Sequence, residues 1–482
     1  MNSNFVNPTY YNLQRAIIRS EYSPEFEVDV TNLIPSISIT SSIDSETMYG
    51  SALVIDSVGL LDGEDGVRSP LRGEEQIILE IADSQTINNN GGNVDDAEDI
   101  FRFIGFIYKI DNVSTKEIND ALVYHIHFVS YQSFKAGTYE IIRAFIDEKI
   151  SDIVQKIFTE NYQNNSVIRN IPESMRKSLF VEETSGTIRC WIPKMRSEEA
   201  MEFLSKRSYS VRSPSCLFRF FESTRGYHYV TDEQLFRLAN DEAEEGYDSN
   251  RKFVFTYLDA IPNTLEYFKQ QINNLEFIEN TKRVNSIDDI LNGVYRNKVY
   301  ELDILSRNLN LLDDGEKSYD YFERRDKYQE IDTEYQRLVD RHTEAFIQDI
   351  HRRDSSDVQK SWLIIQNYTP TEESSEELAL PAETYYAEIV SNRQAYSKHI
   401  ESITVNAKGP GRLDITAGDI VELDIQEFKF ADGRSDGDFE KNRHLSGNYI
   451  VRTVTHHMDK EEMFNTYVLI KRDWSSVENL DG

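Results

Sequence analysis

Hydrophobic and polar positions alternate most clearly near the C-terminal end of the chain. In the stretch ITAGDIVELDI, Val421, Leu423 and Ile425 alternate with acidic residues. A period of two is typical of a strand with one buried face. An acidic, glycine-containing segment follows, and then two more apolar runs, SGNYIVRTVTHHM and TYVLIKRDW. The pattern predicts a small β-domain of four short strands between residues 402 and 474.

The same succession of elements occurs earlier, between residues 35 and 130. SISIT matches ESITV, LRGEEQIILEI matches ITAGDIVELDI, and an acidic loop and two further strands follow in each copy. The alignment sets Leu71, Glu75, Ile77, Leu79 and Ile81 against Ile415, Asp419, Val421, Leu423 and Ile425. Gly73 and Gly418 fall one residue out of step, and YGSALVIDSVGLLD has no counterpart. We therefore predict one β-domain used twice, with turn and strand positions at Gly73, Leu79, Ile81, Gly418, Asp419, Leu423, Ile425 and Gly447.

Mixed elements lie between the two copies. A helix is predicted after Ser151, with Ile153, Val154, Ile157 and Phe158 on one face. TIRCWIP is expected to be a strand that stops at Pro193, followed by a helix capped at Ser197. LFRFF and GYHYV flank Arg225-Gly226 and predict a hairpin, with a capping box at 231–234 after it. Further predictions are helices at 286–293 and within 315–352, and a linker ending at Pro381.

The paired strand domains, the stretch IPKMRSEEAMEFLSKRS between them and the ending SGNYIVRTVTHHM…TYVLIKRDW resemble the baseplate hub protein of contractile-tailed bacteriophages, a family related to the base of type VI secretion spike proteins. The resemblance covers residues 30 to 474. It implies an α+β fold in which two similar antiparallel β-barrel, tube-type domains flank an α+β middle region. The expected domains are an N-terminal extension (1–30), a first barrel (31–131), the middle region (132–384), a second barrel (385–475) and a C-terminal tail (476–482).

Composition and charge narrow the classes of function. The chain has 482 residues, of which 39% are hydrophobic, so it can form sizeable cores. With 84 Asp and Glu against 52 Lys and Arg, its net charge of −32 disfavours tight, sequence-independent DNA binding. Two cysteines support neither a disulfide framework nor a cysteine zinc site, which fits assembly in a reducing cytoplasm. No apolar run approaches the ~20 residues of a membrane-spanning helix, so neither a signal peptide nor membrane insertion is expected.

Candidate catalytic and metal-binding residues form no recognisable constellation. The sequence contains no GxSxG, P-loop, GxGxxG or HExxH motif. His125 and His127 share the polar face of a strand, but no third metal ligand lies near in sequence. His456 and His457 point to opposite faces, and we expect them at a strand end that faces neighbours or solvent. We predict no catalytic residue, no cofactor and no metal.

The resemblance implies a structural hub in the virion, assembled in the host cytoplasm. Three copies with two β-domains each would present six similar modules and so adapt the sixfold tail tube to the threefold central spike. The implied partners are a second and third copy, the trimeric spike, tail tube or tube-initiator proteins, and tape measure and baseplate wedge proteins. Genome DNA would pass without specific binding, along a repulsive wall if part of the acidic charge lines the channel.

Two segments and two alternative functions complete the prediction. The acidic loops at 84–100 and 427–446 are long for hairpin loops and are expected to contact neighbouring baseplate or tube proteins. One alternative is the base of another contractile injection or secretion spike. The other, from a different class, is a soluble carbohydrate-active or binding protein.

Overall fold

The computed structural model describes the following residues, and every structural statement below concerns them: 7–20, 27–61, 71–89, 100–115, 121–164, 176–212, 216–235, 252–257, 272–282, 297–303, 308–311, 360–366, 389, 393, 397, 401, 403–430, 437–442, 445–460 and 462–471. The predicted helices at 286–293 and 315–352 and the linker ending at Pro381 lie outside them.

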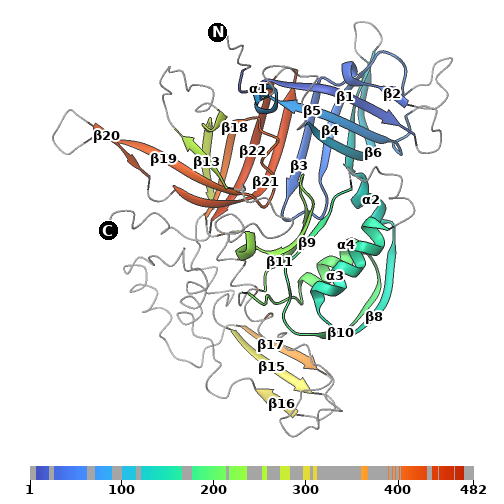
Figure 1. The fold of residues 1–482 in the computed structure, drawn as a ribbon, viewed down its shortest axis with the longest axis vertical. Coiled ribbons are helices and arrows are strands. Elements are labelled where there is room, and N and C mark those ends of the chain that lie inside the picture. Colours follow the sequence, from blue (N-terminus) through green and yellow to red (C-terminus); the bar gives the residue numbers. More distant parts are fainter. Residues whose placement is uncertain are drawn as a thin grey trace.

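A 14-stranded sheet dominates the molecule (Figure 1). Its N-terminal part, here called the first module, contains β1 (Tyr11–Arg19), β2 (Glu27–Asp29), β3 (Ser36–Ser42), β4 (Tyr49–Asp56), β5 (Gln76–Asp83), β6 (Phe101–Thr115) and β7 (Leu122–Ser130), with the short helices η1 (Thr31–Leu33) and α1 (Ser84–Asn89). The second module contains β13 (Lys252–Tyr257), β14 (Phe277–Lys282), β18 (Ile403–Pro410), β19 (Ile420–Phe430), β20 (Gly437–Lys441), β21 (Gly447–Asp459) and β22 (Glu462–Lys471). Burial alternates along the strands as the sequence predicts.

The two modules pair their strands in the same order. The first runs β3-β4-β7-β6-β5, and the second runs β14-β18-β22-β21-β19. The next strand differs, because β1 pairs antiparallel with β5 whereas β13 pairs parallel with β19. The register also agrees, because β6 has a bulge at Tyr108 opposite β7, and β21 has a bulge at Arg452 opposite β22. A second shift in β6, between Asp111 and Ser114, has no counterpart in the pairing of β21 with β22. Leu79 pairs with Phe103, and Leu423 pairs with Gly447. The alignment of LRGEEQIILEI with ITAGDIVELDI therefore matches the hydrogen-bond register.

One part of the repeat was wrongly aligned. β18 pairs with β22 as β4 pairs with β7, so ESITV begins the counterpart of β4 and not of SISIT, which forms β3. YGSALVIDSVGLLD, expected to have no counterpart, contains β4. The place of β3 is held in the second module by β14, which lies in the middle of the sequence. Short alternating runs look alike, so local pattern alone could not distinguish two neighbouring strands.

No pairing among the described strands closes either module into a barrel. β3 pairs along its free edge with β21 of the second module, and the two modules thereby form one open sheet. The two expected barrels are therefore not found among the described strands, and in the first module the outer edge of β3 is occupied by β21. The fold is α+β as predicted, mostly antiparallel sheet with few helices.

The middle region packs short helices on small sheets (Figure 1). It contains α2 (Tyr131–Gly137), β8 (Glu140–Glu148), α3 (Ile150–Phe158), the π-helical turn η2 (Thr159–Gln163), β9 (Leu179–Val181), β10 (Ile188–Arg196), α4 (Ser197–Ser205), β11 (Phe218–Glu222) and β12 (Tyr227–Thr231). A further three-stranded sheet contains β15 (Asn297–Asp303), β16 (Asn308–Leu311) and β17 (Lys360–Gln366).

Most predictions for the middle region are confirmed, with two corrections. Helix α3 buries Ile153, Val154, Ile157 and Phe158, and the hairpin β11–β12 forms around Arg225-Gly226. β10, however, continues past Pro193, where a register shift between Ile192 and Met195 accommodates the missing N–H. The N-cap of α4 is Arg196 rather than Ser197.

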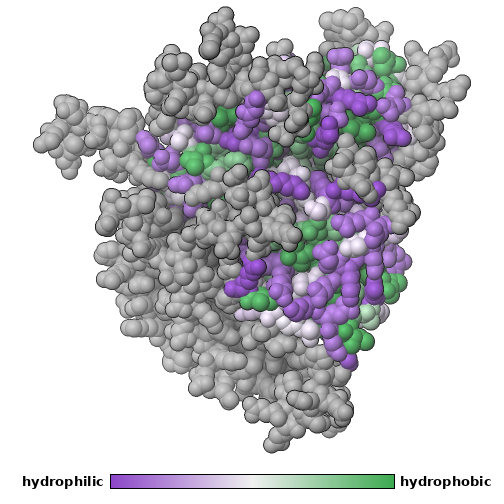
Figure 2. Space-filling model, viewed as in Figure 1, coloured by the Kyte–Doolittle hydropathy of each residue, from purple (hydrophilic) through white to green (hydrophobic). Residues whose placement is uncertain are grey.

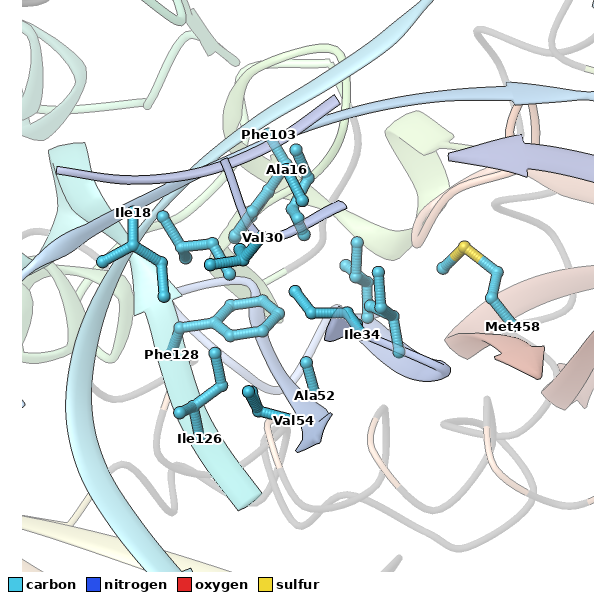
Figure 3. Packing of buried hydrophobic residues seen from close by; sticks show 14 of the residues in the cluster. Ala16, Ile18, Val30, Ile34, Ala52, Val54, Phe103, Ile126, Phe128 and Met458 are labelled. Atoms are coloured by element: carbon cyan, nitrogen blue, oxygen red, sulfur yellow. The ribbon is translucent and has the colours of Figure 1, made fainter. Parts of the chain in front are cut away.

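The hydrophobic cores cross the boundary between the modules. The core of the first module contains Leu413, Met458 and Met463 from the second. Figure 3 shows Met458 reaching toward Ile34 from a strand of the second module. A separate cluster joins Phe221 of the hairpin to Ala417, Ile420, Ile450 and Ile470. None of the helices in the described part of the chain is long and apolar enough to span a membrane.

Candidate functional site: the joint between the two β modules

The pairing of β3 with β21 brings together residues more than four hundred positions apart in the sequence. Thr40 Oγ1 lies 2.9 Å from Thr455 Oγ1, and Ser42 Oγ lies 2.9 Å from Thr453 Oγ1. The N–H of Ile43 donates to the carbonyl of Arg452 at 2.9 Å and extends the ladder past the end of β3. Side-chain and main-chain hydrogen bonds together join the modules as firmly as two neighbouring strands of one sheet.

Turns with a glycine in the left-handed region precede both β5 and β19. Gly73 and Gly418 have φ values of +87° and +88°, a left-handed conformation that glycine adopts without a Cβ clash. Glu75 accepts the N–H of Arg72, three residues earlier, at 2.9 Å. Asp419 accepts the N–H of Thr416, also three residues earlier and at 2.9 Å.

The main chain after the two turns also corresponds. The carbonyls of Glu75 and Asp419 accept the N–H groups of Ile107 and Val451, both at 2.8 Å. Of the remaining predicted positions, Leu79 and Ile81 lie in the first core, while Leu423 and Ile425 lie in the second. Gly447 pairs with Leu423. The structure thus places these positions in two separate cores and turns, and it does not bring the two sets into one site.

The hairpin β11–β12 of the middle region binds both modules. Glu222 is fully buried and accepts hydrogen bonds from the N–H of Met48 at 3.0 Å and from Ser130 Oγ at 2.7 Å, both in the first module. Lys177 Nζ lies 2.8 Å from the same carboxylate and compensates its charge. A buried carboxylate with this many donors holds the neighbouring backbone in place.

The tip of the same hairpin reaches the second module. Arg225 forms an ion pair with the fully buried Asp419 at 2.6 Å and donates to the carbonyl of Asp414 at 3.0 Å. The N–H of Thr224 donates to Thr416 Oγ1 at 3.1 Å. A Cβ on Gly418 would lie 2.9 Å from Cζ of Phe221, so the hairpin also requires glycine there.

A charged network lies beside the joint. Asp44, in the turn after β3, forms ion pairs with Arg219 of the hairpin and with Arg452, the bulge residue of β21. Arg219 also binds Asp232 at 2.9 Å. Burial raises the pKa of Asp232 to about 6, and the Arg219 charge opposes that shift. The network ties the hairpin, the first module and the second module to one another.

The histidines do not form a metal site in the described part of the chain, where no group of three or more metal-ligating side chains comes together. His456 is fully buried, contrary to the expected position facing neighbours or solvent. Its Nδ1 lies 3.0 Å from Asn465 Oδ1, and burial lowers its pKa to about 4. His457 stacks on Phe464, and His127 contacts Asp111 at 3.1 Å. His456 is therefore a neutral core residue.

The expected acidic loops are in part regular structure. Residues 84–89 form α1, and β19 continues to Phe430 and pairs with β20, so Gln426 lies opposite Lys441. The paired strands correct the interpretation of 427–446 as one long loop; the remaining loop residues lie outside the described part of the chain.

Sequence reasoning missed the residues that make the joint. Glu222, Arg219 and Arg225 looked like ordinary charges on a hairpin. The alternating hydroxyls of SISITSS and RTVTHHM were the one available signal, because small hydroxyl residues at alternate positions fit a strand whose polar face is hydrogen-bonded to another strand.

Comparison with known proteins gives matches in structure only. No family model matches the sequence, and no curated protein matches it significantly. A tail protein from Neisseria meningitidis MC58 aligns over 97% of this chain and 98% of its own, with a TM-score of 0.46 and 8% identity.

Two further structures align over a similar length. The 43 kDa tail protein of prophage MuSo2 from Shewanella oneidensis covers 96% of this chain and 99% of its own, with a TM-score of 0.44 and 8% identity. An E. coli component of the type VI secretion system covers 96% and 77%, with a TM-score of 0.39 and 8% identity. Over most of its length the chain is similar to solved structures of phage tail proteins and type VI secretion proteins.

Proposed function

We propose that this chain is the structural hub of a phage contractile-tail baseplate. Three copies would form a ring in which each subunit contributes two similar β modules. The ring would match the sixfold tail tube with its six modules and the central spike with its threefold symmetry, and its centre would form part of the channel for genome ejection.

The observation that carries the proposal is the β3–β21 pairing. It joins two modules of the same strand order and bulge position into one sheet within a single chain. An adaptor between sixfold and threefold symmetry needs such a fixed pair, because a flexible link would let the six modules lose their regular spacing. The contacts of Glu222 and Arg225 with the two modules support the same requirement.

The turns and strand positions of the two modules have a structural role in this proposal. Gly73, Leu79, Ile81, Gly418, Asp419, Leu423, Ile425 and Gly447 would maintain the two equivalent modules, and none would take part in catalysis. The partners would be the other two copies, the spike and the tail tube or tube-initiator proteins, with tape measure and baseplate wedge proteins as further partners. The protein would act in the virion after assembly in the host cytoplasm.

Native mass spectrometry tests the proposal directly. The expected particle has three times the subunit mass of 56.1 kDa and binds a trimeric spike protein. Electron microscopy of that particle should show six similar densities around one axis. A monomer that cleaves glycosidic bonds would contradict the hub and support the carbohydrate-active alternative, whereas a trimer carrying its own spike would support the secretion-spike base.

A further inference from the structure

The long strand β21 shares one of its edges between two neighbours. Its residues from Gly447 to Ile450 pair with β19, and those from Thr453 to Asp459 pair with β3 of the first module. The bulge at Arg452 lies between the two stretches, and β22 pairs along the opposite edge. The joint between the modules therefore occupies only the second half of this edge.

β6 is the counterpart of β21 and divides its edge at the same place. Its residues from Phe101 to Phe106 pair with β5, the bulge at Tyr108 follows, and β7 pairs along the opposite edge as far as Thr115. Beyond the bulge, no described strand pairs with β6 on the β5 side. The stretch from Lys109 to Thr115 thus has an unpaired edge at the position where β3 joins β21.

β14 is the counterpart of β3, because β14 pairs with β18 as β3 pairs with β4. The segments that lead into the two strands are also held alike. Leu275 donates its N–H to the carbonyl of Thr256 on β13, and Val30 donates its N–H to the carbonyl of Ala16 on β1, both at 2.8 Å. The outer edge of β3 pairs with β21, whereas no described strand pairs with the outer edge of β14. One subunit therefore carries two unpaired edges, on β6 and on β14, that correspond to the two sides of its internal joint.

Both unpaired edges expose large apolar side chains. Tyr108 and Val113 on β6 are 51% and 52% exposed, and Phe277 on β14 is 51% exposed. Figure 2 shows apolar residues interspersed with polar ones over the first module, at the upper right of the view. A strand edge of this kind presents unpaired N–H and C=O groups and is a template for pairing with another strand.

The register of the internal joint can be carried over to the two unpaired edges. In the joint, His457 lies opposite Ser38. Measured along β7 and β22 from the bulges, Ser114 takes the place of His457. The pairings across β4 and β18 put Glu279 in the place of Ser38. In the same register, Ser114 would lie opposite Glu279.

The charges of the two edges are compatible with this register. It sets Asp111 opposite Lys282, a residue of opposite charge, and it brings no two like charges opposite each other in the described stretch. Asp111 also contacts Lys109 and His127 of its own module. The main contribution to affinity would therefore come from main-chain hydrogen bonds, as in other cases of strand addition.

We propose that β14 of one copy pairs antiparallel with the unpaired edge of β6 in the next copy, with Ser114 opposite Glu279 of the partner subunit. This inference rests on the proposed hub function and specifies the contact between its subunits. The contact would repeat between chains the joint that β3 and β21 form within one chain. A head-to-tail contact of this kind closes into a ring, in which joints within subunits alternate with equivalent joints between them.

Disulfide formation between engineered cysteines in the full-length protein tests the inference. Ser114→Cys and Glu279→Cys are combined in one chain, whose two native cysteines are buried. A disulfide requires Cα atoms within about 7 Å of each other, so these cysteines should link subunits only if the two strands lie in the proposed register. We expect mild oxidation to convert most of the protein into linked dimers and trimers, resolved by denaturing electrophoresis without reductant.

The double variant Ser114→Cys/Glu276→Cys is the matched control. It removes the same carboxylate charge and carries the same number of cysteines. Glu276 is exposed but precedes Glu279 by three residues, which is roughly 10 Å along an extended chain. We expect at least about ten-fold less linked product from the control. Equal yields from the two double variants would contradict the proposed register.

Hydrogen exchange of the unmodified protein gives a measurement that needs no variant. In the trimer, the amides of residues 109–115 should exchange as slowly as those of residues 453–459 in the internal joint, within about ten-fold. Dilution to monomers should accelerate exchange in residues 109–115 and in β14, and leave residues 453–459 unchanged.

The outcomes separate this inference from the hub function. A trimer whose β6 and β14 amides exchange as fast as in the monomer, or whose cysteines at 114 and 279 do not link, overturns the inference and leaves the hub proposal standing. If the cysteine variants fail to assemble, the exchange rates of the unmodified trimer decide. A monomeric protein overturns the hub proposal and, with it, the inference.

Discussion

The turns before β5 and β19 each contain a glycine with a positive φ, but their surroundings differ. A Cβ on Gly73 would meet nothing closer than Ile110 at 3.9 Å, whereas a Cβ on Gly418 would collide with Phe221 of the hairpin. Glu75 contacts backbone N–H groups of its own turn, while Asp419 also binds Arg225. The two modules share a strand order, but only in the second module does the turn contact the hairpin of the middle region, through Arg225 and Phe221.

The hairpin β11–β12 contacts the first module at a different place. Its Glu222 accepts hydrogen bonds from Met48, just before β4, and from Ser130, at the end of β7. Two modules of equal strand order are therefore attached unequally. In a ring, this difference would let alternate modules contact different partners while their strands keep one common arrangement.

Among the substitutions considered, loss of Glu222, which links the hairpin to the first module, should lower the free energy of unfolding most. Glu222→Ala leaves the Lys177 charge and the N–H of Met48 without their buried acceptor, which we expect to lower the free energy of unfolding by about 3–5 kcal/mol. Chemical denaturation followed by tryptophan fluorescence measures the change. Glu183→Ala removes an exposed partner of Lys149 and should leave the transition unchanged. Equal effects of the two variants would contradict this account of the attachment.

The two glycine turns give the most direct test of the comparison. Both Gly73→Ala and Gly418→Ala place a Cβ at a positive φ, but only the second also overpacks against Phe221. We expect Gly418→Ala to destabilise the protein by about 1–3 kcal/mol more than Gly73→Ala, measured by thermal unfolding. Phe221→Leu should restore part of the loss in Gly418→Ala alone. Identical losses would mean that the hairpin does not constrain the second turn.

The turn between β3 and β4 should make the stability of the protein sensitive to pH. Burial, together with the neighbouring charges of Glu198 and Glu202, raises the pKa of Glu46 to about 7, while Arg196 opposes the shift. Because the folded pKa exceeds that of the unfolded chain, the fold favours the protonated form, and this contribution is lost as pH rises through about 7.

In the parent protein, ionisation of Glu46 should lower the free energy of unfolding by on the order of 1 kcal/mol between pH 5 and pH 8. Glu46→Gln, which cannot ionise, should not show this decrease. The measurement is the difference in melting temperature between variant and parent at each pH. This subtraction cancels other groups such as Asp232, whose pKa is also raised. A difference independent of pH would show that Glu46 does not titrate in this range.

The hydroxyl pair of the joint should have the smallest effect. Removing one hydroxyl in Thr40→Val or Thr455→Val leaves the other without its partner at 2.9 Å, at a cost of about 1 kcal/mol each. The double variant should cost less than the sum of the two, which a double-mutant cycle of unfolding free energies measures. Additive losses would mean that these hydroxyls act independently and do not join the modules.

Much of the local structure followed from the sequence alone. The alternation of LRGEEQIILEI and ITAGDIVELDI predicted strands with one buried face, and the helical spacing around Ile153 predicted α3, because side-chain periodicity records which face is buried. The sequence contains none of the catalytic motifs GxSxG, P-loop, GxGxxG and HExxH, and it therefore indicated no catalytic site.

The tertiary structure decided how these elements are joined. Local pattern does not encode which strand edge meets which, so SISIT was set against the wrong partner and the sharing of one sheet through β3 and β21 was not foreseen. The roles of Glu222 and Asp419 were also decided by the tertiary structure. Glu222 is buried because the hairpin packs on the first module, and Asp419 is paired with Arg225, which lies 194 residues away in the sequence. Sequence determines the faces of each strand; only folding determines the neighbours that those faces and edges acquire.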